Sequence, residues 1–225
     1  IRYRPEGTMA ASDRFVIKVK GKQTHGSTPW TGVDPIVTSA KIIDGLQTII
    51  SRKTELTKAA AVISVGKIQA GVRNNIIPEE AEMIGTIRTL DTGMQEKIHN
   101  EIRHVATTIG ESMGAEVEVD IQKGYPVTYN DPTLTENMLP TLQQIAGNDK
   151  VVLSDAITGA EDFSFFQKEV PGFYFFTGGM PKGMNPAEAA PHHTPDFYIE
   201  EEGMKLGVRA LASLTVDYMM MNSGN

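Results

Sequence analysis

Two polar loops carry the histidines that are best placed to do chemistry. His25 lies within residues 21–29, where flanking glycines let the backbone approach a ligand closely. His192 and His193 lie in a second polar loop, between a predicted strand and the last predicted helix, where an imidazole could reach a metal ion. Neighbouring residues of an extended loop point in different directions, so only one of this pair is expected to bind a given ion. The sequence has no cysteine, so any metal would be held by His, Asp or Glu.

Other polar residues suit the recognition of an anionic substrate. Glu161 follows the small residues Gly159 and Ala160 at the start of a predicted helix. It could simply cap that helix, or the small residues could bring backbone N–H groups to a substrate carboxylate or oxyanion. Arg88 could pair with a carboxylate through two parallel hydrogen bonds, and Asn75 lies in the same polar group around two predicted strands. A surface arginine on a strand is the commoner case, so both explanations stay open.

The elements that must position these residues follow a regular order between residues 13 and 124. Apolar and polar residues alternate at 15–19, 59–69, 81–90 and 116–121, which predicts four strands. Helical spacing predicts one helix between the first two strands and another between the last two. The resulting order is β-α-β-β-α-β, the ferredoxin-like split unit, and the fold class is α/β of the α+β kind.

The two predicted helices have clear end signals. Asp34 caps the first, with Pro35 at its first position. Asp91 or Thr92 caps the second, which ends at Gly114. His99 and His104 fall off the apolar stripe of this second helix, and we expect both to be solvated.

Residues 125–225 change in character. The pattern predicts helices at 133–146, 162–170 and 200 to about 221, with strands at 151–153 and 172–176. These pieces amount to about half of a layered α/β domain by ordinary domain size. We therefore interpret residues 125–225 as the C-terminal part of a larger domain, residues 13–124 as an insertion in it, and residues 1–12 as a linker or the end of an upstream segment. Ile1 resembles the inside of a strand, so we expect residues before it.

Composition and charge limit the classes of partner that this chain could bind. The formal net charge of -7 disfavours nucleic acid, because binding phosphates requires a basic surface. No apolar run of about 18 residues and no charged leader is present, so we expect no membrane span, no signal peptide and a cytoplasmic location. The 40% of hydrophobic residues is typical of a folded globular chain. A small-molecule or peptide substrate fits best.

Four motifs in one order resemble a known family. They are Met9-Ala10-Ala11-Ser12-Asp13-Arg14-Phe15 with the His25 loop and Gly32-Val33-Asp34-Pro35; Asn75-Ile76-Ile77-Pro78 with Gly85-Thr86-Ile87-Arg88-Thr89; Gly159-Ala160-Glu161-Asp162-Phe163-Ser164-Phe165; and His193-Thr194-Pro195 with Phe197. Together they resemble the zinc-dependent aminoacylase and carboxypeptidase superfamily of amidohydrolases, in its hippurate hydrolase and auxin-conjugate hydrolase branch. The resemblance covers nearly the whole chain and includes a complete lid domain, through which a homodimer would form.

The resemblance implies a role for each candidate residue. His193 would be a metal ligand, and His25 would polarise the scissile carbonyl, usually in the active site of the partner subunit. Asn75 and Arg88 would hold the substrate carboxylate, while Gly159 and Glu161 would line the pocket floor. The cofactors would be two divalent ions, zinc or alternatively manganese, cobalt or nickel. The substrate would be an N-acyl amino acid, an amino-acid conjugate or a peptide.

The sequence also departs from that family. Members supply most metal ligands and the general base from residues before the lid, and none of these is present here. A lone His193 cannot assemble a two-metal site, so we expect this chain to be inactive by itself. The alternative from another class is a non-catalytic ferredoxin-like module for dimerisation or binding.

Overall fold

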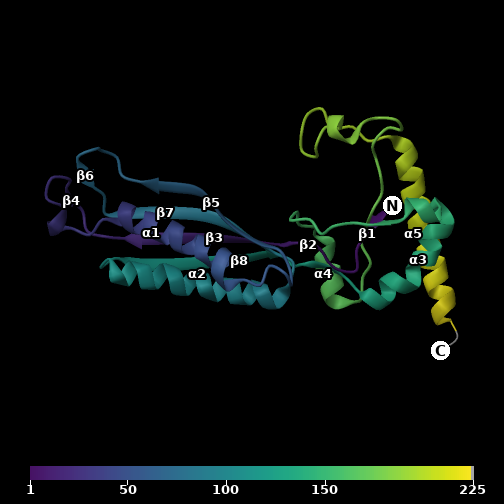
Figure 1. Cartoon of the computed structure of the whole chain (residues 1–225), viewed down its shortest axis with the longest axis horizontal. Helices are drawn as coiled ribbons and strands as arrows, with labels where there is room; N and C mark the ends of the chain where they lie inside the picture. The colour runs from purple at the N-terminus through teal and green to yellow at the C-terminus, as the bar shows by residue number, and fades with distance from the viewer. Residues whose placement is uncertain (224–225) are drawn as a thin grey trace. The chain divides into compact units, whose positions relative to one another are not determined.

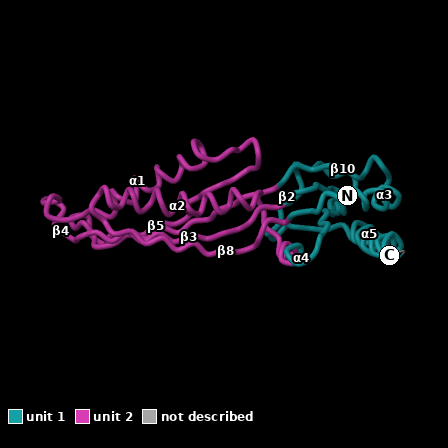
Figure 2. Tube along the Cα trace, turned by 90° about the horizontal axis from the view of Figure 1, so that it is seen from below, with its two compact units in different colours: residues 1–8, 129–156, 166–225 teal, residues 9–128, 157–165 magenta. Residues whose placement is uncertain are grey.

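The computed structural model describes residues 1–223, which fold as two compact units. Unit 1 comprises residues 1–8, 129–156 and 166 onward, and unit 2 comprises residues 9–128 and 157–165 (Figure 2). Within the described range, no helix has the length and apolar character needed to cross a membrane.

A four-stranded antiparallel sheet is the frame of unit 2. Its strands lie in the order β5 (Ala61–Ala70), β7 (Glu80–Thr89), β3 (Ala11–Lys20) and β8 (Glu116–Tyr125). Helices α1 (Pro35–Thr48), continued by the π-helical turn η2 (Ile49–Lys53), and α2 (Thr92–Ser112) pack along it (Figure 1). The chain order β3-α1-β5-β7-α2-β8 confirms the predicted β-α-β-β-α-β fold.

The core of unit 2 lies between this sheet and the two helices. Phe15, Ile17 and Val19 of β3 are fully buried, whereas the alternating residues of the strand face away from the helices. Gly85 of β7 lies opposite Phe15 in the register. A β-carbon at residue 85 would come within 2.2 Å of Cζ of the Phe15 ring, so the aromatic ring requires glycine there.

The helix ends follow the signals in the sequence. Asp34 Oδ1 accepts hydrogen bonds from the backbone N–H groups of Ile36 and Val37, at 2.8 and 3.1 Å. Asp91 Oδ1 accepts one from Met94 at 2.7 Å. Gly114 has a φ of +76°, the left-handed conformation that ends a helix with least strain when no side chain is present.

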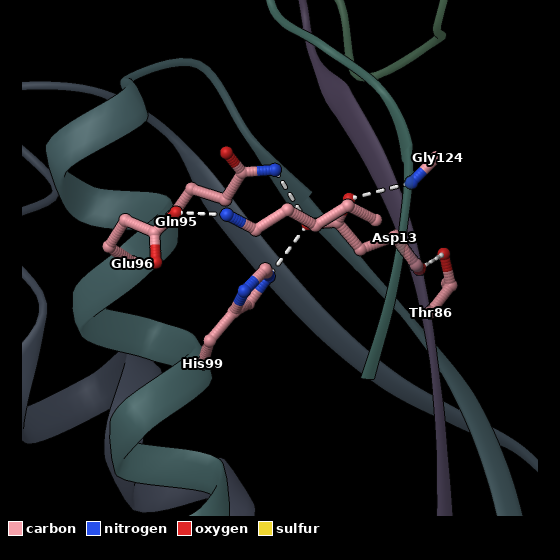
Figure 3. A network of polar contacts seen from close by, with 7 residues as sticks. Asp13, Thr86, Gln95, Glu96, His99 and Gly124 are labelled. Carbon is pink, nitrogen blue, oxygen red and sulfur yellow. Dashed lines mark hydrogen bonds and ion pairs between the residues drawn. The ribbon is translucent and has the colours of Figure 1, made fainter. Parts of the chain in front are cut away.

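His99 corrects the prediction of a solvated helix histidine. Its side chain is buried, and Nε2 donates to Oδ2 of Asp13 at 2.7 Å (Figure 3). Gln95, one turn earlier on α2, donates to the same oxygen at 2.7 Å, and the backbone N–H of Gly124 on β8 donates to Oδ1 at 3.2 Å. His104 is exposed, as predicted. The error arose because helical spacing alone does not reveal that a strand places a buried carboxylate opposite the helix.

The network determines the ionisation of Asp13. Burial alone would raise the pKa of this carboxyl, but the hydrogen bonds from His99, Gln95 and Gly124 outweigh it and hold the pKa below its usual range. Asp13 is therefore a buried carboxylate that keeps its charge because three donors from two other elements surround it.

Unit 1 contains a small sheet and two packed helices. Strand β1 (Arg2–Tyr3) lies between β10 (Val152–Leu153), which is parallel to it, and β11 (Phe175–Phe176), which is antiparallel. Helix α3 (Pro132–Ala146) packs against α5 (Glu201–Asn222), and Leu142, Val151 and Ala210 are buried among them.

The remaining elements of the described chain are two short ladders, one short helix and three 3-10 turns. The ladders are β2 (Glu6–Met9) with β9 (Thr128–Asn130) and β4 (Thr24–His25) with β6 (Ile76–Ile77). The helix is α4 (Phe163–Glu169), and the turns are η1 (Pro29–Thr31), η3 (Asn148–Lys150) and η4 (Pro186–Glu188).

The strand predicted at residues 172–176 is shorter than expected, because a side chain replaces part of its ladder. Asn130 Oδ1 accepts from the backbone N–H of Tyr174 at 2.6 Å, and its Nδ2 donates to the carbonyl of Tyr174 at 2.7 Å. The amide of Asn130 thus takes both backbone groups that a neighbouring strand would otherwise bond. Only Phe175–Phe176 joins the sheet.

Candidate functional site

The loop that carries His25 is joined to the loop that carries Asn75. Strand β4 pairs with β6 so that His25 lies opposite Ile76, and Gly26 donates to the carbonyl of Asn75 at 2.8 Å. A β-carbon on Gly26 would approach the Asn75 carbonyl to 3.2 Å, so glycine permits this close approach. His25 and Asn75 are both exposed. We call His25, Ser27 and Asn75 the tip cluster; Figure 1 shows β4 and β6 together at one end of the sheet.

Ser27 holds one side of the His25 ring. Nδ1 of His25 lies 2.7 Å from Oγ of Ser27 and 3.1 Å from the backbone nitrogen of the same residue. The backbone turn around them is closed by the N–H of Thr28, which donates to the carbonyl of His25 at 2.9 Å.

Arg88 lies at the other end of unit 2. It is half-buried on β7, opposite Ser12 of β3, and its guanidinium forms no ion pair with any residue from 1 to 223. The carbonyl of Gly159 accepts from the N–H of Ala10, just before β3, at 2.9 Å. We call Arg88, Gly159 and Glu161 the base cluster, because all three lie at the end of the sheet where β3 begins.

Glu161 accepts hydrogen bonds at the start of α4. Its carboxylate accepts from the backbone N–H of Phe163 at 3.4 Å, and its carbonyl accepts from the hydroxyl of Ser164 at 2.6 Å. These contacts support the first turn of α4. They agree with the simpler of the two explanations drawn from the sequence, in which Glu161 caps the helix.

The two clusters are too far apart to touch one small substrate within a single copy of unit 2. The tip cluster lies beyond the Glu80 end of β7, where Gly21 donates to the carbonyl of Glu79 at 2.8 Å. From Glu80 to Arg88 the strand is continuous, and at about 3.4 Å per residue it extends roughly 27 Å. The structure therefore brings His25 together with Asn75, but not with Arg88.

His193 lies in unit 1, in the turn before α5. It is exposed and has a φ of +64°, one of two non-glycine residues in the described chain with positive φ. The ring of His192 packs on Phe197 with centroids 4.5 Å apart, and lies 6.5 Å from the ring of His193. The imidazole of His192 thus packs against an aromatic ring.

A pocket of about 660 Å³ adjoins this turn. Its lining includes His192 and Phe197 together with three methionines, Met180, Met184 and Met204. Methionine side chains give an apolar wall that adapts to differently shaped groups.

The described residues do not form a metal site by themselves. Nowhere in residues 1–223 do three His, Asp or Glu side chains lie close enough together to hold an ion. His193 fits a single position in a coordination shell, since it is an exposed imidazole on a constrained turn, and a stable site needs further ligands.

Comparison with known proteins identifies the domain to which residues 11–114 belong. Residues 11–114 match the model of the peptidase dimerisation domain of the M20 family. The chain carries an M20 peptidase dimerisation domain. The match begins at the first residue of β3 and ends at Gly114, after α2. It confirms the resemblance deduced from the motifs of the His25 and Asn75 loops.

Two curated relatives match far beyond the M20 dimerisation domain. Thermostable carboxypeptidase 2 of Saccharolobus solfataricus is 37% identical over 213 residues, covering 93% of this chain and 52% of the relative. IAA-amino acid hydrolase ILR1-like 4 of Arabidopsis thaliana is 30% identical over 220 residues, covering 96% of this chain and 49% of the relative. This chain therefore spans about half the length of these curated relatives.

A solved structure shares the fold of nearly the whole chain. The crystal structure of Bacillus subtilis YXEP, described as a dinuclear metal binding peptidase from the M20 family, has a TM-score of 0.72 and 29% identity. The similarity covers 95% of this chain and 51% of that protein. The fold on both sides of the M20 dimerisation domain is thus shared with a metal-binding peptidase.

Ser27 and Asp13 are polar residues to which the sequence pattern assigned no role. Ser27 follows His25 by two residues, the spacing at which a backbone N–H can reach the ring of the histidine. Asp13 shares the inward phase of Phe15, Ile17 and Val19, and a carboxylate in a buried phase requires a partner. Both signals are present in the sequence, but only the structure shows the partners.

Proposed function

We propose that this chain is the lid and C-terminal catalytic portion of a metal-dependent amidohydrolase. The reaction would be hydrolysis of the amide bond between an acyl or aminoacyl group and an amino acid with a free carboxylate. The M20 dimerisation domain at residues 11–114 supports this, as do relatives named as a carboxypeptidase and as a hydrolase of amino-acid conjugates. Both of those names describe cleavage next to an amino acid.

Arg88 would bind the substrate carboxylate. Its guanidinium is half-buried and forms no ion pair within residues 1–223. A half-buried arginine without a carboxylate partner can pair with a substrate carboxylate through two parallel hydrogen bonds, and this pairing is stronger than at a fully solvated surface.

The single observation that carries the proposal is the distance between the two clusters. If His25, Asn75 and Arg88 act on one substrate, as the resemblance implies, a separation of roughly 27 Å prevents one subunit from supplying all three. Two copies related by a two-fold axis solve this problem, because each active site then takes Arg88 from one subunit and His25 with Asn75 from its partner. The proposal therefore requires a homodimer.

His193 would provide one ligand to a pair of divalent ions, zinc or alternatively manganese, cobalt or nickel. When bound, these ions would activate the water that attacks the amide carbonyl. The other ligands and the general base would come from residues outside this chain, so we propose that the chain is inactive by itself. His25 would donate a hydrogen bond to the carbonyl oxygen as negative charge develops there.

A non-catalytic dimerisation module remains a second candidate, because the family match covers residues 11–114 alone. The two candidates differ in what they require of unit 1. A module needs neither His193 nor the adjoining turn, whereas an enzyme needs both.

The test is a pair of substitutions in a longer protein that contains this chain together with the other ligands. His193→Ala should lose both bound metal and activity, whereas His25→Ala should lose most activity with its metal content unchanged. Metal content is measured by mass spectrometry of the purified variants. Normal turnover in both variants would contradict the roles proposed for His193 and His25, whereas no turnover in the unsubstituted longer protein would leave the module.

A further inference from the structure

The contacts of the His25 ring determine which of its nitrogens carries the proton. The backbone N–H of Ser27 points at Nδ1 from 3.1 Å, and a backbone amide can only donate. Nδ1 must therefore present its lone pair, and the neutral ring must carry its hydrogen on Nε2. The Ser27 hydroxyl, 2.7 Å from the same nitrogen, is then also a donor.

The backbone around this contact is held in place. The N–H of Thr28 donates to the carbonyl of His25, and the N–H of Gly26 donates to the carbonyl of Asn75. These two bonds fix the turn and attach it to the β6 loop, so the N–H of Ser27 keeps its direction toward the ring. The ring is exposed, and without these contacts it could exchange tautomers and rotate freely.

We propose that Ser27 is a positioning residue that holds His25 as the neutral tautomer with its hydrogen on Nε2. Nε2 has no hydrogen-bond partner within residues 1–223, and it lies at the end of the ring that points away from the bond to the β-carbon. The ring thus offers one donor of fixed direction at the end of the tip cluster. A donor of fixed direction needs no reorientation when an oxyanion forms.

This inference rests on the proposed function, in which His25 polarises the scissile carbonyl. It adds that His25 acts as an uncharged donor through Nε2 and does not remove a proton with that nitrogen. It also makes Ser27, which acts through the His25 ring, a determinant of the rate of the chemical step.

The tautomer can be measured without any catalysis. The full chain is labelled with 15N-histidine, and long-range 15N–1H correlations are recorded at about pH 8, where imidazoles are largely neutral. His25 should show only the form with hydrogen on Nε2. In Ser27→Ala, which keeps the N–H but removes the hydroxyl, the second form should become detectable, whereas Ser27→Thr should retain the original state. The signal of the exposed His104, in α2, should be the same in all three proteins.

The kinetic arm uses the longer protein that contains this chain. Ser27→Ala should lower kcat by about three- to tenfold, the effect of losing one neutral hydrogen bond, with KM almost unchanged. Ser27→Thr should restore kcat. A merely structural role for Ser27 would instead change stability or KM and would leave the tautomer as it was.

The two arms separate failure of this inference from failure of the proposed function. Hydrogen on Nδ1 in the unsubstituted chain, or an unchanged tautomer and kcat in Ser27→Ala, overturns the inference and leaves the hydrolase assignment standing. Normal turnover of His25→Ala together with the Nε2–H form contradicts the role of His25 in the proposed function, and with it the catalytic use of the Ser27 contact.

Discussion

Nε2 of His99 and Oδ2 of Asp13 lie 2.7 Å apart, and this buried pair joins helix α2 to the central strand β3 of the M20 dimerisation domain. Gln95 and the backbone of Gly124 add two more donors to the same carboxylate. Asp13 lies opposite Ile87 in the register, next to Arg88. The network therefore fixes the packing of α2 at the end of the sheet that carries the base cluster.

His99→Ala should destabilise the chain strongly. Removing the imidazole leaves the Asp13 carboxylate buried without its closest donor, and breaking such a buried pair costs about 3 kcal/mol or more. The matched control is His104→Ala on the same helix, which should change the free energy of unfolding by no more than about 0.5 kcal/mol because His104 is exposed. Urea denaturation followed by circular dichroism measures both, and equal losses in the two variants would refute the structural role of His99.

Acid should weaken the fold through Asp13. The pKa of Asp13 is lowered in the folded chain, so its contribution is fully present above the unfolded value of about 3.9 and is lost as the pH falls through the lower folded value. The free energy of unfolding is measured by urea denaturation from about pH 7 down to pH 3 for the unsubstituted chain and for Asp13→Asn.

Asp13→Asn isolates this contribution from those of the exposed carboxylates. The variant should be less stable than the unsubstituted chain at neutral pH, and the difference should shrink as acid protonates Asp13 in the unsubstituted chain. A difference that stays constant across this range would show that the charge of Asp13 does not stabilise the fold.

Gly85→Ala should destabilise unit 2. Its methyl group would lie 2.2 Å from Cζ of Phe15 and 2.3 Å from the carbonyl oxygen of Ser64, so the strand or the ring must shift, at a cost of about 2 kcal/mol or more. Gly66→Ala on β5 is the control, since a β-carbon there meets no atom within 4 Å. Its free energy of unfolding should stay the same or rise by up to about 1 kcal/mol, because alanine has fewer unfolded conformations than glycine. Thermal denaturation compares the two, and a tolerated Gly85→Ala would contradict the packing of Phe15 against β7.

Much of the fold was predictable because local chemistry determined it. Asp34 and Asp91 each accept hydrogen bonds from backbone N–H groups in the first turn of the helix that they cap. Gly114 adopts the left-handed conformation directly after the end of α2. Such contacts involve residues only a few positions apart, so spacing in the sequence reveals them. The alternation of Phe15, Ile17 and Val19 likewise reports burial on one face of a strand.

Contacts between residues that are far apart in the sequence could not be predicted in the same way. The burial of His99 depends on a carboxylate on β3, and the shortening of the strand at 175–176 depends on the side chain of Asn130. For the candidate site, the sequence placed Asn75 and Arg88 in one polar group, and the family resemblance assigned His25 to the active site of the partner subunit. Only the pairing of β4 with β6 and the register of β7 separate these three residues into two clusters.

The intact lid should make the chain a dimer. The match to a peptidase dimerisation domain and the need for two copies at each active site both lead to this expectation. Light scattering coupled to size exclusion, run over a range of concentrations, should give twice the 24.5 kDa mass of the chain. A monomer at the highest concentration would count against the shared active site.

Mixing two inactive variants of the longer protein tests the central claim most directly. His25→Ala and Arg88→Ala proteins are each inactive in this account, but a mixed dimer contains one active site with an intact Arg88 from one subunit and an intact His25 from the other. After dissociation and random reassociation, the mixture should recover roughly a quarter of the unsubstituted activity. A mixture of His25→Ala with Asn75→Ala, which both affect the tip cluster, should recover none. Recovery in neither mixture, with mixed dimers demonstrated by mass spectrometry, would contradict an active site shared between two subunits.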